Sequence, residues 1–215
     1  MEQPPLCAAG RVIPSAVDRI RRYCGLSWSG GPPETWAWRY YDTVATAPDD
    51  EVIPVDVMCA AALHPGLSRD DLVWFHDHRA DLEALLADVP ADLVLADLSE
   101  HQVDHLASLP DALDGPSVSL VSKVLHRKRP DVIPLIDRHI VDWFRPVTRQ
   151  RALGGAWGPI VRELWAEEHE DRRNEALAEA IRQVQHDLDH SDEGRGGGTL
   201  SWLRAKDIAI WMGSR

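Results

Sequence analysis

The sequence predicts an all-α fold, and three observations support this class. Apolar residues recur at three- and four-residue spacing through most of the chain, as on the buried face of a helix. Clusters of Ser, Gly and Pro separate these segments, as they do at helix ends. No series of segments alternates polar and apolar residues as the strands of a half-buried sheet do. We therefore expect one multi-helix globular domain over residues 1–215, with two helical lobes around a cleft near residues 99–145 as the alternative.

The composition is that of a globular protein, and we expect it in the cytoplasm. Of the 215 residues, 44% are hydrophobic and 27% are charged, which is enough apolar material for a core. The three scattered cysteines indicate a reducing compartment rather than a disulfide framework. We see no signal peptide and no apolar run long enough to span a bilayer, so no membrane partner is expected. The net charge of −12 repels nucleic acid on average, so binding to nucleic acid requires a local basic patch.

Serine residues mark the expected helix starts in the N-terminal half. Ser15 is expected to cap the first helix and Ser68 the fourth, where Asp71 gives a variant of the capping box. Residues 25–33 are expected to form a loop, because Gly, Ser and Pro dominate them. The four expected helices cover residues 16–24, 34–46, 55–64 and 69–89. The fourth helix has an apolar face formed by Leu82, Leu85, Leu86 and Val89.

A helix–turn–helix unit is expected in the middle of the chain. Ser99 is expected to cap its first helix, over residues 100–109, and a turn that contains Gly115 leads to a second helix over residues 118–129. The N–H groups at the start of the second helix can bind a DNA phosphate. Further helices are expected over residues 138–147, 157–170, 175–190 and 201–212.

The second helix of this unit ends in a basic cluster. Lys123, Arg127, Lys128 and Arg129 give residues 115–130 a net charge of about +4, because this stretch contains no acid. That charge is sufficient for local contacts with phosphate. The alternative interpretation is a solvated helix end whose cations complement the helix dipole.

Asp137 stands alone at the start of the next helix. Pro130 and Pro134 keep the preceding residues extended and non-helical. Taken by itself, Asp137 is interpreted as an N-cap carboxylate that accepts backbone N–H bonds. Its spacing from the helix–turn–helix unit suggests a second, chemical role.

The segment "GPSVSLVSKVLHRKRPDVIPLIDRHI" resembles the core of the helix-hairpin-helix DNA glycosylases, the superfamily of endonuclease III and 8-oxoguanine glycosylase. In that core a Gly-x-Gly-x-Lys hairpin precedes a helix, a connector and an apolar stretch that ends in Asp-x-His. Gly115 and Ser117 fall on the two hairpin glycines, with Ser117 a departure from the pattern. Ser119 falls on the lysine that bifunctional members use as nucleophile. Asp137 falls on the catalytic aspartate and His139 on the histidine two residues later.

A second resemblance covers more of the chain. The segments "SKVLHRKRPDVIPLID" and "LRAKDIAIWM" look like those of an uncharacterised bacterial domain family often described as having a glycosylase-like fold. Both resemblances imply a DNA glycosylase that flips a modified base out of double-stranded DNA and hydrolyses its N-glycosidic bond. The implied process is base-excision repair or defence against DNA with modified bases.

The resemblance also implies roles for single residues. Asp137 is expected to stabilise the oxocarbenium-like sugar and to orient water. Ser119, in the place of the nucleophilic lysine, favours simple hydrolysis over strand cleavage. Lys123 lies one helical turn after Ser119 on the same face, so it is a candidate for the same pocket. A Schiff-base role for Lys123 requires that desolvation lower the pKa of its amine.

The remaining candidate residues are expected to contact DNA. They are Gly115, Ser117, Ser122, His126, Arg127, Lys128, Arg129 and His139. We expect no cofactor and no metal site, because the chain has no H-E-x-x-H motif and no Cys-x-x-Cys pair. We predict no protein partner. A non-catalytic DNA-binding module of the same fold is the main alternative, and a protein-interaction scaffold that meets an acidic partner is a third class.

Overall fold

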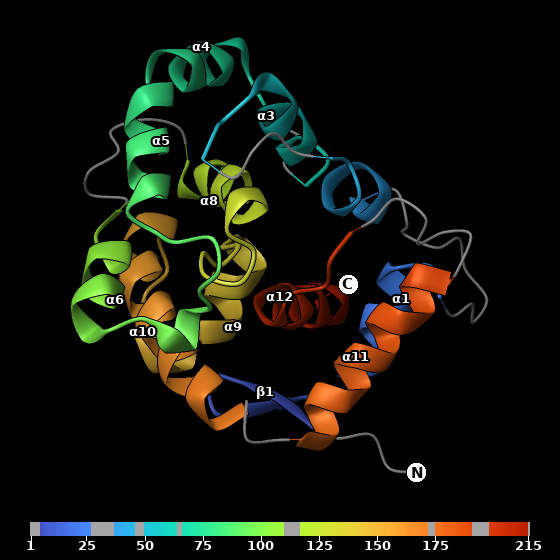
Figure 1. Ribbon diagram of the computed structural model, residues 1–215. Helices are drawn as coiled ribbons and strands as arrows, with labels where there is room; N and C mark the ends of the chain where they lie inside the picture. Colours follow the sequence, from blue (N-terminus) through green and yellow to red (C-terminus); the bar gives the residue numbers. More distant parts are fainter. Residues whose placement is uncertain are drawn as a thin grey trace.

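The protein has the all-α fold that its sequence predicts (Figure 1). The computed structural model describes residues 5–26, 37–45, 50–63, 66–109, 117–171, 175–190 and 198–214. Its helices are α1 (Ala16–Tyr23), α3 (Pro54–Ala60), α4 (Arg69–Asp77), α5 (Arg79–Ala87), α6 (Glu100–Ala107), α8 (Val118–Lys128), α9 (Arg138–Thr148), α10 (Leu153–Asp171), α11 (Glu175–His190) and α12 (Trp202–Gly213). Two short turns of other helix types are the π-helical Trp38–Asp42 and the 3-10 Leu95–Asp97. No described helix is long and apolar enough to cross a membrane.

A small β-hairpin near the N-terminus was not expected from the sequence. Strand β1 (Leu6–Ala8) pairs antiparallel with β2 (Arg11–Ile13). The turn between them places both Ala9 and Gly10 at positive φ, 56° and 64°. Tight hairpin turns of this kind need positive φ at both central residues, which glycine and asparagine adopt readily but alanine rarely does. Three-residue strands joined by such a turn leave no periodic pattern to detect.

The predicted caps agree with the structure at three of four positions. The side chains of Ser68, Ser99 and Asp137 each accept a backbone N–H at the start of α4, α6 and α9. Ser15 precedes α1, but its side chain makes no capping bond, so this prediction is wrong. Its backbone is left-handed, with φ 52°. A capping residue normally has extended φ and ψ, which direct its oxygen toward the first N–H groups of the helix.

The long helix expected over residues 69–89 is instead two helices, α4 and α5. His78 ends α4 and precedes α5, with φ −102° and ψ 14°. The His78 ring stacks on the Trp74 ring at 4.4 Å, and its Nδ1 lies 2.9 Å from the Trp74 carbonyl oxygen. The apolar face predicted for the 69–89 helix is buried: Leu82, Leu85 and Leu86 lie on α5, and Val89 follows two residues after its end.

Helix α12 lies in the middle of the molecule, with α8 and α9 on one side and α1 and α11 on the other (Figure 1). Every residue from 203 to 210 is buried. A helix that is covered all round belongs to the core. Three of its buried residues are nevertheless ionisable, namely Arg204, Lys206 and Asp207.

Candidate functional site

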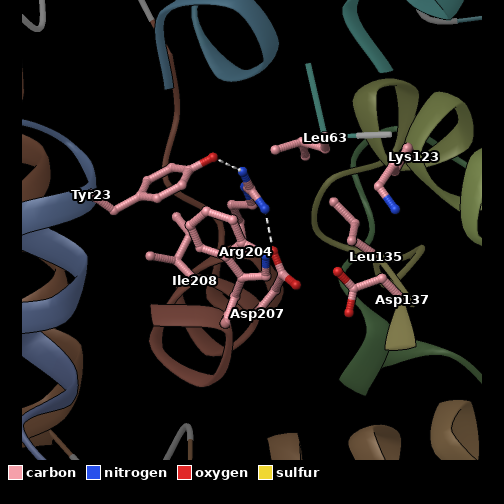
Figure 2. Close-up of a pocket in the computed structure, with 9 residues that line it drawn as sticks. Tyr23, Leu63, Lys123, Leu135, Asp137, Arg204, Asp207 and Ile208 are labelled. Atoms are coloured by element: carbon pink, nitrogen blue, oxygen red, sulfur yellow. Dashed lines mark hydrogen bonds and ion pairs between the residues drawn. The ribbon is translucent and has the colours of Figure 1, made fainter. Parts of the chain in front are cut away.

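A pocket lies between α8, the start of α9 and α12 (Figure 2). The space between its atoms is about 260 Å³ when open solvent is included. The polar lining residues that the structure describes come from three regions of the chain that are far apart in sequence: Tyr23 from α1, Lys123 and Asp137 from residues 123–137, and Arg204 and Asp207 from α12. The apolar residues Leu63, Leu135, Ile208 and Trp211 complete the lining.

Asp137 reaches this pocket from the N-terminus of α9. Its Oδ1 accepts hydrogen bonds from the backbone N–H groups of His139 at 2.8 Å and Ile140 at 3.1 Å. The predicted N-cap role is therefore confirmed. These N–H groups and the helix dipole stabilise a negative charge on the carboxylate. The cap fixes the direction of the side chain, and Figure 2 shows the carboxylate facing Asp207 across the pocket.

Lys123 enters the pocket from α8 and is almost fully buried, with 1% of the residue exposed. Its Nζ donates to the Ser119 Oγ at 2.6 Å and to the Ser119 carbonyl oxygen at 3.2 Å. The expected pairing of these two residues on one helix face is therefore present. Ser119 does not line the pocket but holds the lysine that does. Burial lowers the pKa of the Lys123 amine, which Asp137 and Asp207 partly oppose.

Asp207 is the second carboxyl group of the pocket, and sequence reasoning missed it. It is 5% exposed and receives a hydrogen bond from the Arg204 Nη1. Burial raises the pKa of Asp207 to about 7, with further contributions from the negative charges of Asp137 and Asp42. The positive charges of Arg204 and Lys123 oppose this rise. Asp207 therefore holds its proton to a higher pH than an ordinary carboxyl group does.

A buried network fixes Arg204 beside Asp207. Its Nε and Nη2 donate to the two Asp42 oxygens at 2.7 and 2.8 Å, and Nη2 also lies 2.5 Å from the Tyr23 hydroxyl oxygen. All four groups are buried or nearly so. The sequence signal for this network was "LRAKDIAIWM", where an arginine, a lysine and an aspartate interrupt a helix that is otherwise apolar on every side. Charged residues are almost never buried without partners, so such a helix indicates a buried polar site.

The basic end of α8 is not available to DNA, so the interpretation of Arg127, Lys128 and Arg129 as accessible phosphate contacts is wrong. Asp56 of α3 lies 2.6 Å from the Lys128 Nζ and 3.4 Å from the Arg127 Nε, and all three side chains are buried. Arg129 pairs with Asp50 and is also buried. The cations are used inside the fold to join α8 to the N-terminal half.

Arg129 additionally binds the C-terminal end of α5. Its guanidinium donates to the carbonyl oxygens of Leu86 at 2.8 Å and Val89 at 2.5 Å. The last carbonyl groups of a helix have no partner within the helix, and cationic side chains stabilise them. Arg129 therefore stabilises the fold by binding the end of α5, which explains why its charge is buried.

The other residues expected at the DNA surface are placed as follows. Ser122 is buried, and its Oγ accepts the Ile136 N–H at 3.1 Å. It therefore holds residues 130–136, the connector that leads to Asp137. His126 is buried, its Nδ1 lies 2.7 Å from the Ile133 carbonyl oxygen, and burial lowers its pKa to about 3. Both are therefore internal supports of the connector, and their expected contact with DNA is corrected.

Three expected DNA contacts remain. Ser117 is exposed and caps α8, with its Oγ 3.3 Å from the Leu120 N. His139 is half-buried, and its Nδ1 lies 2.8 Å from the Ser214 Oγ. Gly115 and the turn around it lie outside the described residues. Within the described parts of the chain, no group of three or more His, Cys, Asp or Glu side chains is placed to hold a metal ion.

Comparison with known proteins gives one match. The model of a family of unknown function, DUF6308, matches residues 16–214 and so includes every residue of the pocket. No curated protein and no solved structure matches the chain.

Proposed function

We propose that this chain, which belongs to the DUF6308 family of unknown function, hydrolyses an N-glycosidic bond, with a modified base in DNA as the substrate. The observation that supports the proposal is the meeting of Asp137 and Asp207 across one pocket in different surroundings (Figure 2). One carboxyl group lies at a helix N-terminus that stabilises its anion. The other is buried, and its pKa is raised to about 7. A pair of carboxyl groups whose surroundings separate their protonation states supplies an acid and a base at neutral pH.

The proposed reaction uses the two carboxyl groups in different roles. As the C1′–N bond breaks, its electron pair leaves with the base, and the protonated Asp207 gives its proton to a nitrogen of that base. The Asp137 carboxylate stabilises the positive charge on the sugar. Water then forms the C1′–O bond and loses its proton to Asp137. Exchange with solvent restores both groups. Lys123 and Arg204 add positive charge to the pocket, and burial raises the pKa of Asp207 against their effect.

Lys123 supports a second candidate function, a glycosylase that also cleaves the strand. The lowered pKa of its buried amine is the condition that a Schiff-base nucleophile needs. In that reaction the Lys123 Nζ forms a bond to C1′ as the C1′–N bond breaks and its electron pair leaves with the base. The attached nitrogen loses a proton, the C1′–O4′ bond breaks, and O4′ takes up a proton to give a protonated imine. Loss of a C2′ proton and departure of the 3′ phosphate by β-elimination then cleave the strand. The hydrogen bonds of Lys123 to Ser119 compete with this use of the amine.

The experiment is an excision assay on a panel of DNA duplexes, each with one modified base. Wild-type protein is compared with Asp137→Asn and Asp207→Asn, and Asp189→Asn is the control because Asp189 is exposed on α11. We expect each pocket variant to lower the excision rate by about 100-fold or more and the control to leave it unchanged. Excision that persists in Asp137→Asn contradicts the proposed mechanism.

Borohydride separates the two candidate reactions. Reduction traps an imine as a stable protein–DNA adduct. A strand-cleaving enzyme gives an adduct that Lys123→Ala loses, whereas a hydrolytic enzyme gives excision without an adduct. Folded wild-type protein that binds DNA but excises no base from the panel favours the non-catalytic module.

A further inference from the structure

A second charged surface lies on α9 and the turn that follows it. Arg138, Arg145 and Arg151 line an open hollow together with Asp142, and the space between atoms is about 910 Å³, open solvent included. Arg149 directly follows α9 and is exposed. We call these four arginines, Arg138, Arg145, Arg149 and Arg151, the α9 arginine surface.

The orientation of α9 directs the side chains of Arg138 and Arg145 to solvent. Ile140, Val141 and Phe144 are buried and form the inner face of the helix. Arg138, Asp142 and Arg145 are spaced i, i+4 and i+7, so they share the opposite, outer face. The side chain of Arg138 is 89% exposed and that of Arg145 is 46% exposed. These cations are therefore accessible, in contrast to those at the end of α8.

Acidic residues are scarce around this surface. Residues 143–162 contain four arginines and neither aspartate nor glutamate, in a chain whose net charge is −12. Among the described residues that line the hollow, Asp142 is the one carboxylate, and it pairs with both Arg138, at 3.9 Å, and Arg145. The three arginines and one aspartate among the described lining residues sum to a net charge of +2.

The surface is also close to the pocket along the chain. Helix α9 begins directly after Asp137, so Arg138 is its sequence neighbour. Arg145 is eight residues after Asp137, which is about 12 Å along a helix axis. One strand of DNA rises about 3.4 Å per nucleotide, so this distance corresponds to roughly three to four nucleotides. A strand whose target sugar is at Asp137 can therefore place its neighbouring phosphates along α9.

We propose that the α9 arginine surface binds the phosphate backbone of the nucleic acid whose target sugar enters the pocket at Asp137. The inference rests on the proposed function for the identity of the ligand. Arginine suits this ligand because its planar guanidinium donates two parallel hydrogen bonds to phosphate. The spacing of the cations along one helix matches a linear, regularly repeated anion.

The test measures binding without chemistry. A labelled DNA duplex that contains no modified base is titrated with full-length protein, and fluorescence anisotropy gives the affinity at salt concentrations from about 50 to 200 mM. Each arginine that contacts phosphate contributes about −0.9 to the slope of log K against log salt. We expect Arg138→Ala/Arg145→Ala/Arg151→Ala to reduce the magnitude of the slope by about 2 to 3 and to weaken binding by roughly tenfold or more.

Two further variants keep the result independent of folding. Asp142→Asn removes the carboxylate from the hollow and is expected to strengthen binding by a few-fold, which an unfolded variant cannot do. Arg182→Ala is the matched control, because Arg182 is 66% exposed on α11 and pairs with Glu179 at i,i+3 spacing as Arg145 pairs with Asp142. We expect this control to change neither the affinity nor the slope.

Several outcomes overturn the proposal. Wild-type protein that does not bind DNA at low salt is one, and a loss of affinity in Arg182→Ala equal to that in the triple variant is another. An unchanged salt slope in the triple variant is a third. The last is competition by a phosphopeptide at a lower concentration than unlabelled DNA requires. Excision that persists with an unchanged slope in the triple variant rejects this surface and leaves the proposed function intact. Binding that depends on the surface without excision of any base supports this surface and rejects the proposed function.

Discussion

Two basic regions that follow one another along the chain have opposite surroundings. At the end of α8, Arg127, Lys128 and Arg129 are buried against carboxylates and carbonyl oxygens. On α9, Arg138 and Arg145 are exposed on the outer face of the helix. Each region contains one carboxylate that lies between two cations, Asp56 in the first and Asp142 in the second.

The difference shows what a run of positive charge does and does not predict. A dense cation cluster requires anions nearby, but those anions can come from a ligand or from the same chain. At α8 they come from residues 50 and 56, which are more than 70 positions away in sequence. At α9 the part of the chain that the structure describes supplies a single exposed carboxylate, Asp142. A cluster of charge is therefore assigned to a ligand only when its tertiary partners are known.

The largest effect is expected at Asp56. Asp56→Asn removes the carboxylate that lies between Arg127 and Lys128 in the core. Breaking a buried ion pair by removing one partner leaves an uncompensated charge and costs about 3 to 5 kcal/mol of the free energy of unfolding. Urea denaturation followed by circular dichroism measures this change.

The matching change on the exposed side is Asp142→Asn. Asp142 also lies between two cations, but its side chain is 46% exposed. Surface pairs contribute about 0 to 1 kcal/mol, so the free energy of unfolding should stay within about 0.5 kcal/mol of wild type. If Asp56→Asn and Asp142→Asn lose equal free energy of unfolding, the division into a buried cluster at α8 and an exposed cluster at α9 is wrong.

The next largest effect concerns the pH dependence of stability. Burial raises the pKa of Asp207 to about 7, whereas a carboxyl group in the unfolded chain has a pKa of about 3.9. Between about pH 4 and pH 7 the folded protein holds a proton at Asp207 that the unfolded chain has lost. Stability therefore falls as pH rises through this window. We expect Asp207→Asn to remove a fall on the order of a few kcal/mol, measured by urea denaturation across this range.

The effect is measured as a difference between variant and wild type, because His126 acts in the opposite direction. Burial lowers its pKa to about 3, so the unfolded chain holds the extra proton and stability rises between about pH 3 and pH 6.5. The charged groups around Asp207 are Arg204, Lys123, Asp137 and Asp42, and Asp207→Asn leaves all of them in place. A variant whose stability follows the wild-type pH curve rejects the assignment of the proton to Asp207.

A smaller loss of stability is expected from a substitution at Ser122, which links the buried helix α8 to the segment before Asp137. Its Oγ accepts the N–H of Ile136, the residue before Asp137. Ser122→Ala leaves this buried N–H without its partner, which costs about 1 to 3 kcal/mol, and loosens the connector that positions Asp137. We expect excision to fall as well.

Ser99→Ala is the control for this prediction. It removes an exposed helix cap, which lowers the free energy of unfolding by about 1 kcal/mol, and Ser99 does not line the pocket. Equal excision by the two variants shows that Ser122 acts on stability alone.

The sequence predicts those parts of the molecule that local physics controls. Helix periodicity identified the fold class, and side-chain caps identified the starts of α4, α6 and α9. The errors occurred where the decisive contact is distant or the backbone is unusual. Ser15 has a left-handed backbone, and the β-hairpin depends on positive φ at Ala9. Neither feature has a strong signal in residue type, because alanine and serine are rarely found in these conformations.

The candidate site was predictable in part for the same reason. Asp137, Ser119 and Lys123 lie within 18 residues of each other, so spacing alone brings them to adjacent elements. Asp207 and Arg204 come from the last helix, and Tyr23 comes from the first. Only the packing of α12 against α1 and α9 brings them to the same pocket. The sequence marks Arg204 and Asp207 only as charged residues on a helix that is too apolar to be exposed. This pattern indicates that they are buried, but it does not indicate which residues they contact.

The smallest expected effect tests the exposed side of the comparison directly. The ion pair of Arg145 with Asp142 lies on the outer face of α9, where water and salt screen it and two side chains lose freedom to form it. A double-mutant cycle of Arg145→Ala and Asp142→Ala should therefore give a coupling energy of about 0.5 kcal/mol or less, decreasing further at high salt. The same cycle on Lys128 and Asp56 should give a coupling several times larger, because both of those side chains are inaccessible to water. A strong, salt-independent coupling at Arg145 means that the outer face of α9 is held by its own carboxylate, in which case the arginines are not available to bind phosphate.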